Sequence, residues 1–168
     1  ADAIITSGGV SVGEADFTKT MMKQLGDVAF WRIAMRPGRP MAIGKITEGG
    51  KSAVLFGLPG NPVAVMVTFL AFVRPALQRL MGGAVTEPVL LKAHSAEALR
   101  KKAGRTEYQR GTVTRDADGR LSVRTTGNQG SGVLRSMVEA NGLIVLHHGQ
   151  GNVAIGDAVD VMMFDGVI

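Results

Sequence analysis

Short apolar runs alternate with glycine-rich loops in the first half of the chain. Ile4–Thr6 predicts a short buried strand, and the apolar residues from Phe17 to Leu25 recur at helical spacing. Gly26 is a suitable stop for the helix that this spacing predicts. Val28–Met35 is rich in β-forming residues and predicts a second strand. The segment therefore starts with strand, glycine loop, helix and strand.

A hairpin is predicted next. Met41–Ile46 and Ser52–Phe56 have the character of two strands, and Glu48-Gly-Gly-Lys51 between them suits a tight turn.

A long apolar helix follows, beginning after Asn61 and running to about Met81. Asn61 is a good N-cap and Pro62 a good first helical residue. The segment is apolar on nearly all sides, which predicts burial between layers. Pro75 is expected to kink the helix or to end its first part.

After Pro88 the pattern changes to short strands separated by turn signals, with a boundary predicted at Gly82–Pro88. Asp116–Gly119 reads as a hairpin turn and Val133–Ala140 as one short helix. We therefore predict an α/β domain over residues 1–84 and a small all-β barrel over residues 85–168. The expected strands are Val89–Ser95, Thr106–Thr114, Leu121–Thr126, Gly142–Leu146 and Ala158–Phe164.

Charge changes this picture modestly. The net charge is +5, and residues 1–84 hold nine Lys/Arg against five Asp/Glu, whereas residues 85–168 hold ten against nine. The chain has one Trp and one Tyr and no basic run interleaved with aromatics, so nucleic-acid binding is not expected. A small anionic ligand explains the surplus of positive charge in residues 1–84 better.

The longest apolar stretch, Val63–Val73, is much shorter than the roughly 20 residues of a membrane span, so no membrane partner is expected. The absence of cysteine excludes disulfides and fits a reducing, cytoplasmic location. A strand begins almost at Ala1, and we expect that an upstream part of the domain is missing from this sequence.

Two glycine loops carry the first candidate site. Each follows an apolar strand and precedes a helix, and such loops gather at the carboxyl edge of a doubly wound sheet, where ligands bind. Tight turns alone are the alternative explanation of these glycines. The glycines of the two loops are Gly8, Gly9, Gly13, Gly57 and Gly60.

Arg36-Pro-Gly-Arg-Pro40 must be a rigid turn, with Pro37-Gly38 at its centre. Its guanidinium groups, together with that of Arg32, could bind phosphate or another oxyanion, although three solvated arginines would give the same pattern.

Asp16 and Glu14 open the first helix. A carboxylate beside a bound oxyanion often holds a metal ion, and Asp16 is the stronger candidate, although capping the helix would also explain it.

Gly9–Gly13 also matches the Gly-x-Ser-x-Gly elbow of serine hydrolases, with Ser11, Asp116 and His147 in the order of that class. We disfavour this reading because the helix begins only near Asp16, whereas the elbow needs its serine directly between strand and helix.

Two features of the second part could contact an anion. Arg110 lies in Tyr108–Gly111, and Ser131 lies in the polar, glycine-rich loop Thr125–Gly132. An ordinary loop, with Arg110 paired to an acid, is the alternative.

These motifs together resemble the molybdopterin molybdenumtransferases, that is, the MoeA proteins and the gephyrin E domain. The matching stretches, in order, are Thr6–Asp16, Met35–Pro40, Gly57–Val63, Gln109–Gly111 and Gly130–Ser131. The resemblance implies the second half of a doubly wound molybdopterin-binding α/β/α domain followed by a β-barrel domain. It also implies insertion of molybdenum from molybdate into adenylylated molybdopterin, Mg²⁺ dependence and a homodimer. The gephyrin likeness leaves open a molybdopterin-binding or scaffold module without turnover.

By motif, the resemblance implies catalytic roles for Asp16, Arg32 and Arg36, with Asp16 also the metal ligand. It implies that Pro37, Pro59 and Pro62 shape the pocket, and that Arg39, Arg110 and Ser131 contact the substrate. The further residues that it implies for substrate binding are Gly8, Gly9, Ser11, Gly13, Gly60 and Asn61. The family more often has lysines at the positions of the arginine turn, so charge is kept here but hydrogen-bond geometry is not.

Overall fold

The computed structural model describes residues 1–8, 20, 24, 26–84 and 88–164. The chain divides into two compact units. The first comprises Ala1–Ile33 and Pro37–Val85, and the second comprises Ala34–Arg36 and Thr86–Ile168.

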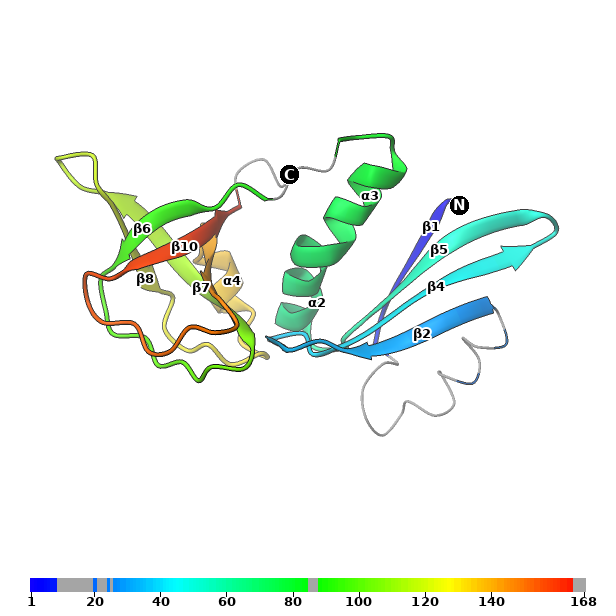
Figure 1. Cartoon of the computed structure of the whole chain (residues 1–168), viewed down its shortest axis with the longest axis horizontal. Helices are drawn as coiled ribbons and strands as arrows, with labels where there is room; N and C mark the ends of the chain where they lie inside the picture. Colours follow the sequence, from blue (N-terminus) through cyan, green and yellow to red (C-terminus); the bar gives the residue numbers. More distant parts are fainter. Residues whose placement is uncertain (9–19, 21–23, 25, 85–87, 165–168) are drawn as a thin grey trace. The chain divides into compact units, whose positions relative to one another are not determined.

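The first unit contains a four-stranded sheet in the order β1-β5-β4-β2 (Figure 1). Strand β1 pairs in parallel with β5, and the β5–β4 and β4–β2 pairs are antiparallel. The parallel pair leaves β1 and β5 with their carboxyl ends at the same edge of the sheet. The strands are β1 (Ala3–Ser7), β2 (Gly26–Arg32), β4 (Pro40–Glu48) and β5 (Lys51–Leu58).

The β4–β5 hairpin confirms the predicted tight turn. Gly49 and Gly50 have φ of 57° and 78°, the positive values that a two-residue type I′ turn requires. Glu48 pairs with Lys51 across the turn, so the strands extend right up to it.

The apolar helix confirms both of its predicted signals. It runs as α2 (Pro62–Thr68), a π-helical turn (Phe69–Val73) and α3 (Arg74–Leu80). Asn61 caps it by accepting a hydrogen bond from the Ala64 N–H at 3.4 Å. Pro75 lies in the first turn of α3, immediately after the π-helical turn, because a proline has no N–H for a regular α-helical bond.

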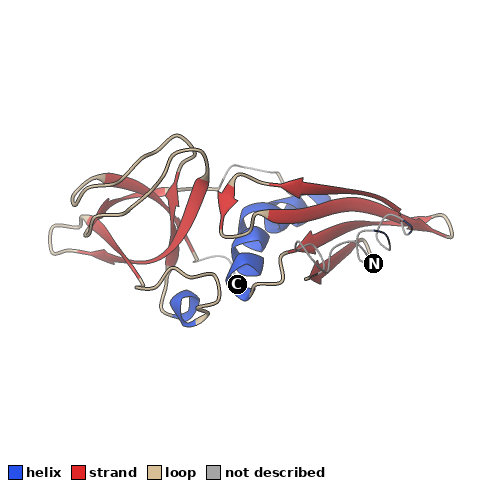
Figure 2. Ribbon diagram, turned by 90° about the horizontal axis from the view of Figure 1, so that it is seen from below, coloured by secondary structure: helices blue, strands red, loops and turns tan. Residues whose placement is uncertain are grey.

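The helix lies along one face of this sheet (Figure 2) and packs on it through a cluster centred on Met41, Phe56, Leu58 and Val73. The prediction of burial on nearly all sides was wrong in this structure. Met66 is 41% and Leu80 53% exposed, because among the described residues the sheet covers only one side of the helix.

By length and composition alone, the stretch Pro62–Leu80 could also cross a membrane, a property that it shares with core helices of water-soluble proteins.

The second unit confirms the predicted barrel. Its sheet has the order β3-β7-β8-β6-β10-β9, and β7 also pairs with β9, so five strands close into a ring. A short helix, α4 (Arg135–Val138), occupies part of the predicted helix over residues 133–140. The strands are β3 (Met35–Arg36), β6 (Leu91–Ser95), β7 (Thr106–Arg115), β8 (Leu121–Thr125), β9 (Gly142–Leu146) and β10 (Ala158–Met163).

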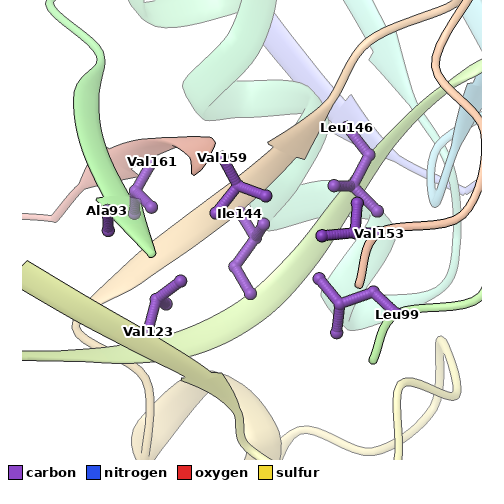
Figure 3. Close-up of a cluster of buried hydrophobic side chains, with 8 residues drawn as sticks. All are labelled: Ala93, Leu99, Val123, Ile144, Leu146, Val153, Val159 and Val161. Atoms are coloured by element: carbon purple, nitrogen blue, oxygen red, sulfur yellow. The ribbon is translucent and has the colours of Figure 1, made fainter. Parts of the chain in front are cut away.

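Aliphatic side chains from most of these strands fill the ring (Figure 3). The cluster comprises Ala93, Leu99, Val123, Ile144, Leu146, Val153, Val159 and Val161. At the β7–β8 turn, the Asp116 carboxylate accepts hydrogen bonds from the N–H groups of Asp118 and Arg120, which confirms the predicted hairpin.

The sequence analysis placed residues 34–36 in the first domain, and the structure corrects this. Met35 and Arg36 pair in parallel with Thr106 and Glu107 of β7, and the Thr106 N–H donates to the Ala34 carbonyl at 2.8 Å. The chain then returns to the first unit, where the Ile33 N–H donates to the Arg39 carbonyl at 2.8 Å. Backbone pairing with β7 therefore decides where this tripeptide belongs.

Candidate anion-binding site

The two glycine loops meet at the carboxyl ends of β1 and β5. Ser7 and Leu58 are the last paired residues, and the Gly8 N–H donates to the Leu58 carbonyl at 3.1 Å. A Cβ on Gly60 would lie 3.4 Å from the Gly8 Cα, which is van der Waals contact. The structure thus brings Gly8 and Gly60 together at the sheet edge where the sequence analysis expected a ligand site.

Thr6 contributes a feature that the sequence analysis missed. Within the described residues, its Oγ1 is the one buried side-chain N or O atom that has no hydrogen-bond partner. A buried hydroxyl without a partner costs about 1–3 kcal/mol, so such a group is expected where a ligand completes the bonding. Its position in the sequence could have indicated it, because Thr6 lies at the end of a predicted strand, two residues before Gly8 and Gly9.

The second loop leads directly into the helix. Pro59 is buried, Gly60 is exposed, and Asn61 and Pro62 form the helix start. The amide groups of the first helical turn carry a partial positive charge and face this end of the sheet, which favours an anion there.

Gly9, Ser11, Gly13 and Asp16 lie outside the described residues, as does Glu14. Within the described part of the chain, no group of three or more His, Asp or Glu side chains could hold a metal ion. Asp16 as a ligand of Mg²⁺ therefore stays a prediction.

The arginine turn is divided between the two units. Pro37 and Gly38 are buried, and Gly38 has φ of 96°, as the third position of a type II turn requires. Arg32 and Arg39 are exposed residues of the first unit, whereas Arg36 is exposed on β3 of the second.

Arg110 is a buried cation at 1% exposure. Its Nε donates to Ser136 Oγ at 2.9 Å, and its Nη2 donates to the Gly130 carbonyl at 3.0 Å. Burial lowers the pKa of Arg110, and the positive charge of Arg36 lowers it further. Among the described residues, the alternative of pairing with an acid was wrong, because backbone carbonyls and a hydroxyl are its partners.

Arg110 also organises the loop that carries Ser131. Its backbone N–H donates to Gln129 Oε1 at 2.7 Å, and the Gly130 carbonyl that it binds immediately precedes the exposed Ser131. Arg36, Arg110 and Ser131 are thus candidate residues carried by the second unit, while Gly8, Pro59, Gly60, Asn61 and Pro62 are carried by the first.

The described residues give the hydrolase reading no support. The Asp116 carboxylate is used by the hairpin turn, and His147 Nε2 lies 2.7 Å from Asp160 Oδ2 instead. Ser11 lies outside the described residues.

The fold and the two glycine loops define a class, the proteins of molybdenum cofactor biosynthesis. Residues 1–79 match the family model described as "Probable molybdopterin binding domain", and residues 92–164 match that of the "MoeA C-terminal region (domain IV)". The chain belongs to the MoeA/gephyrin E-domain family and has its fold: the second half of a doubly wound α/β domain followed by a small β-barrel domain.

Known relatives agree. The chain is similar to a molybdopterin molybdenumtransferase of Haemophilus influenzae, with 41% identity over 100% of the chain and 41% of the relative. It is also similar to gephyrin of Dictyostelium discoideum, with 34% identity over 97% of the chain and 25% of that protein. A crystal structure of a molybdopterin biosynthesis MoeA protein from Pyrococcus horikoshii superposes with a TM-score of 0.70 at 27% identity, covering 98% of the chain and 38% of that structure. The chain thus spans less than half the length of these relatives.

Proposed function

We propose that this chain forms part of an enzyme that inserts molybdenum from molybdate into adenylylated molybdopterin. The observation that carries the proposal is the close approach of Gly8 and Gly60 at the carboxyl ends of two adjacent parallel strands. Thr6, whose hydroxyl has no hydrogen-bond partner among the described residues, lies on the first of these strands. A role in molybdenum cofactor biosynthesis follows from the family, and the names of the relatives support the transferase activity.

The glycine loops would receive the pterin and its phosphate. Gly8, Gly9, Ser11 and Gly13 line one side in this proposal, with the loop from Pro59 to Pro62 on the other. Glycines let backbone N–H groups approach a phosphate closely, and the adjacent helix start adds a favourable field.

The reaction needs no protein nucleophile. The dithiolene sulfurs of molybdopterin replace oxo groups of molybdate, and each displaced oxo group takes up two protons and leaves as water, so the protein contributes position and charge stabilisation. In the proposal, Arg32, Arg36 and Arg39 offset the charge of molybdate and of the nucleotide phosphate, and Arg110 and Ser131 contribute from the barrel. Mg²⁺ would neutralise phosphate charge when bound, and Asp16 is the ligand that we propose for it.

Asp16 can be tested in a chimera in which this chain replaces the matching region of the Haemophilus influenzae relative. We expect Asp16→Asn to abolish most molybdate-dependent cofactor formation and to raise the Mg²⁺ concentration needed for the remainder. Glu14→Gln, the neighbouring carboxylate, is the matched control and should retain activity. Turnover of Asp16→Asn near that of the unmodified chimera would remove the role.

We propose further that the full-length protein that contains this chain is cytoplasmic and forms a homodimer. It is proposed to bind neither nucleic acid nor membrane. Light scattering on the purified chimera measures its molar mass in solution. The mass of a monomer would contradict the proposed dimer.

A second candidate is a molybdopterin-binding or scaffold module without turnover, which the likeness to gephyrin favours. Titration of the 168-residue chain with molybdopterin, followed through the fluorescence of the pterin, tests the binding that both candidates share. Saturable binding that Gly60→Val weakens would support the loop site. Binding that Gly60→Val leaves unchanged would contradict it.

A further inference from the structure

A basic pocket lies within the second unit, formed by the loop before β7 and by neighbouring segments. Its volume is about 410 Å³. Its lining combines five cationic side chains, one carboxylate and one amide: Arg36, Arg100, Lys101, Lys102, Arg105, Glu107 and Asn152.

The loop that carries most of these charges is held in place by the barrel. The Lys101 N–H donates to Asn152 Oδ1 at 2.9 Å, and the Gly104 N–H donates to the His148 carbonyl at 2.8 Å. Lys101 is 6% exposed, and its Nζ donates to the carbonyls of Gln150 at 3.0 Å and Lys102 at 3.2 Å. The cations are therefore presented by a fixed backbone.

Most of the positive charge in the pocket is unpaired. Arg105 Nε lies 2.9 Å from Glu107 Oε1, and Gln109 Nε2 donates to the other carboxylate oxygen at 3.4 Å. Each carboxylate oxygen of Glu107 thus accepts a hydrogen bond within the second unit. Within the described residues, Arg36, Arg100, Lys101 and Lys102 form no ion pair with a carboxylate. Five cations and one carboxylate give this pocket a net charge of +4.

Holding like charges close together is unfavourable unless an anion binds among them. A single sulfate-sized oxyanion would neutralise only half of the charge. Two linked phosphate groups carry about −3 to −4 at neutral pH, which matches it. The planar guanidinium groups of Arg36 and Arg100 suit phosphate oxygens, and the lysines add point charges.

We propose that this pocket is a binding site for a diphosphate group, either free or as part of a nucleotide, in the barrel unit. The pocket is formed by residues of the second unit, whereas the glycine loops belong to the first, and this inference does not rest on the proposed transfer of molybdenum. Arg36 belongs to both this pocket and the arginine turn.

The test is calorimetric titration of the 168-residue chain with inorganic pyrophosphate, ADP and sulfate. We expect pyrophosphate to bind at least about tenfold more tightly than sulfate, since two phosphate groups engage more of the charges. Tighter binding of ADP than of pyrophosphate would assign the site to a nucleotide, and the reverse order to the free anion. Equal affinity for sulfate and pyrophosphate would overturn the diphosphate assignment.

The double variant Arg100→Gln/Lys102→Gln tests the location, because both side chains are exposed and their replacement should not disturb the fold. We expect pyrophosphate affinity to fall at least about tenfold. Arg115→Gln/Arg120→Gln removes the same charge at the β7–β8 hairpin and should change affinity less than about twofold. Equal losses in both variants would show nonspecific attraction, and no loss in the pocket variant would place binding elsewhere; either result overturns the proposal.

Discussion

Gly8 holds a backbone conformation, φ of 87°, that residues with a Cβ rarely adopt. It does so where its N–H bonds to the Leu58 carbonyl, which fixes the start of the first glycine loop against the second. Gly60, in contrast, lies outside the left-handed region, and an added Cβ there would meet only ordinary contact. Both glycines lie at the same edge of the sheet, but only Gly8 has a backbone conformation that favours glycine.

Gly8→Ala is expected to lower the free energy of unfolding by about 1–2 kcal/mol through backbone strain. Gly60→Ala should change it by less than about 0.5 kcal/mol. Urea unfolding of the two variants measures both values. Equal stabilities would show that Gly8 does not need its positive φ.

Arg110 is a structural cation as well as a candidate ligand. Replacing it with Met keeps much of its volume but removes the hydrogen bonds that it donates to Ser136 Oγ and to the Gly130 carbonyl. We expect a loss of about 2–4 kcal/mol in unfolding free energy, against about 1 kcal/mol for Ser136→Ala. Chemical denaturation provides the measurement. An Arg110→Met variant as stable as the wild type would contradict the role of this side chain in the loop.

At the level of elements, the helix start at Asn61 fixes the end of the second glycine loop of the candidate site. Asn61→Ala removes the cap and should cost about 0.5–1 kcal/mol, at the low end because the bond to the Ala64 N–H is long. Asn61→Asp keeps an acceptor and should retain wild-type stability. Thermal unfolding of both variants decides, and equal losses would mean that the side chain does not cap α2.

A charged cluster around Asp160 of β10 includes Lys92 of β6 and His147, the residue that follows β9. Lys92 Nζ lies 2.8 Å from Asp160 Oδ1 and His147 Nε2 2.7 Å from Oδ2. The hydrogen bond from Lys92 lowers the pKa of Asp160 below its ordinary value of 3.8; burial opposes this and His147 adds to it. The unfolded chain has the ordinary pKa of Asp160 and the folded chain the lowered one. Between these two pKa values the unfolded chain binds more protons than the folded chain, so stability is lost as pH falls.

The stability advantage of the wild type over Asp160→Asn should therefore be present near neutral pH and shrink as pH falls below about 4. Urea titrations at several pH values measure it. Asp118→Asn, at an exposed turn position, is the control and should show no such convergence. A constant difference between the wild type and Asp160→Asn across this range would contradict the account.

Elements with local chemical causes were predictable from sequence. Gly49-Gly50 specifies a hairpin turn, Asn61-Pro62 a helix start and Pro75 an interruption, because each acts on its own backbone. The transfer of Met35–Arg36 to the barrel was not predictable, since it depends on pairing with β7, some seventy residues further on. Likewise, a lone Arg110 in the sequence does not reveal that carbonyls, rather than an acid, will be its partners.

At the scale of the whole molecule, the sequence motifs predicted the family, and two family models over residues 1–79 and 92–164 confirm it. The candidate site could be predicted only in part. The meeting of Gly8 and Gly60 follows from two loops of the same pattern, whereas the Thr6 hydroxyl and the basic pocket depend on burial and on loop packing that spacing does not encode.

The most direct test of the central claim is molybdenum insertion by the chimera in which this chain replaces the matching region of the Haemophilus influenzae relative. Molybdenum incorporated into molybdopterin is measured per mole of protein, with purified adenylylated molybdopterin and molybdate supplied. The account predicts turnover comparable with that of the relative. A folded chimera that binds molybdopterin but incorporates no molybdenum would contradict it.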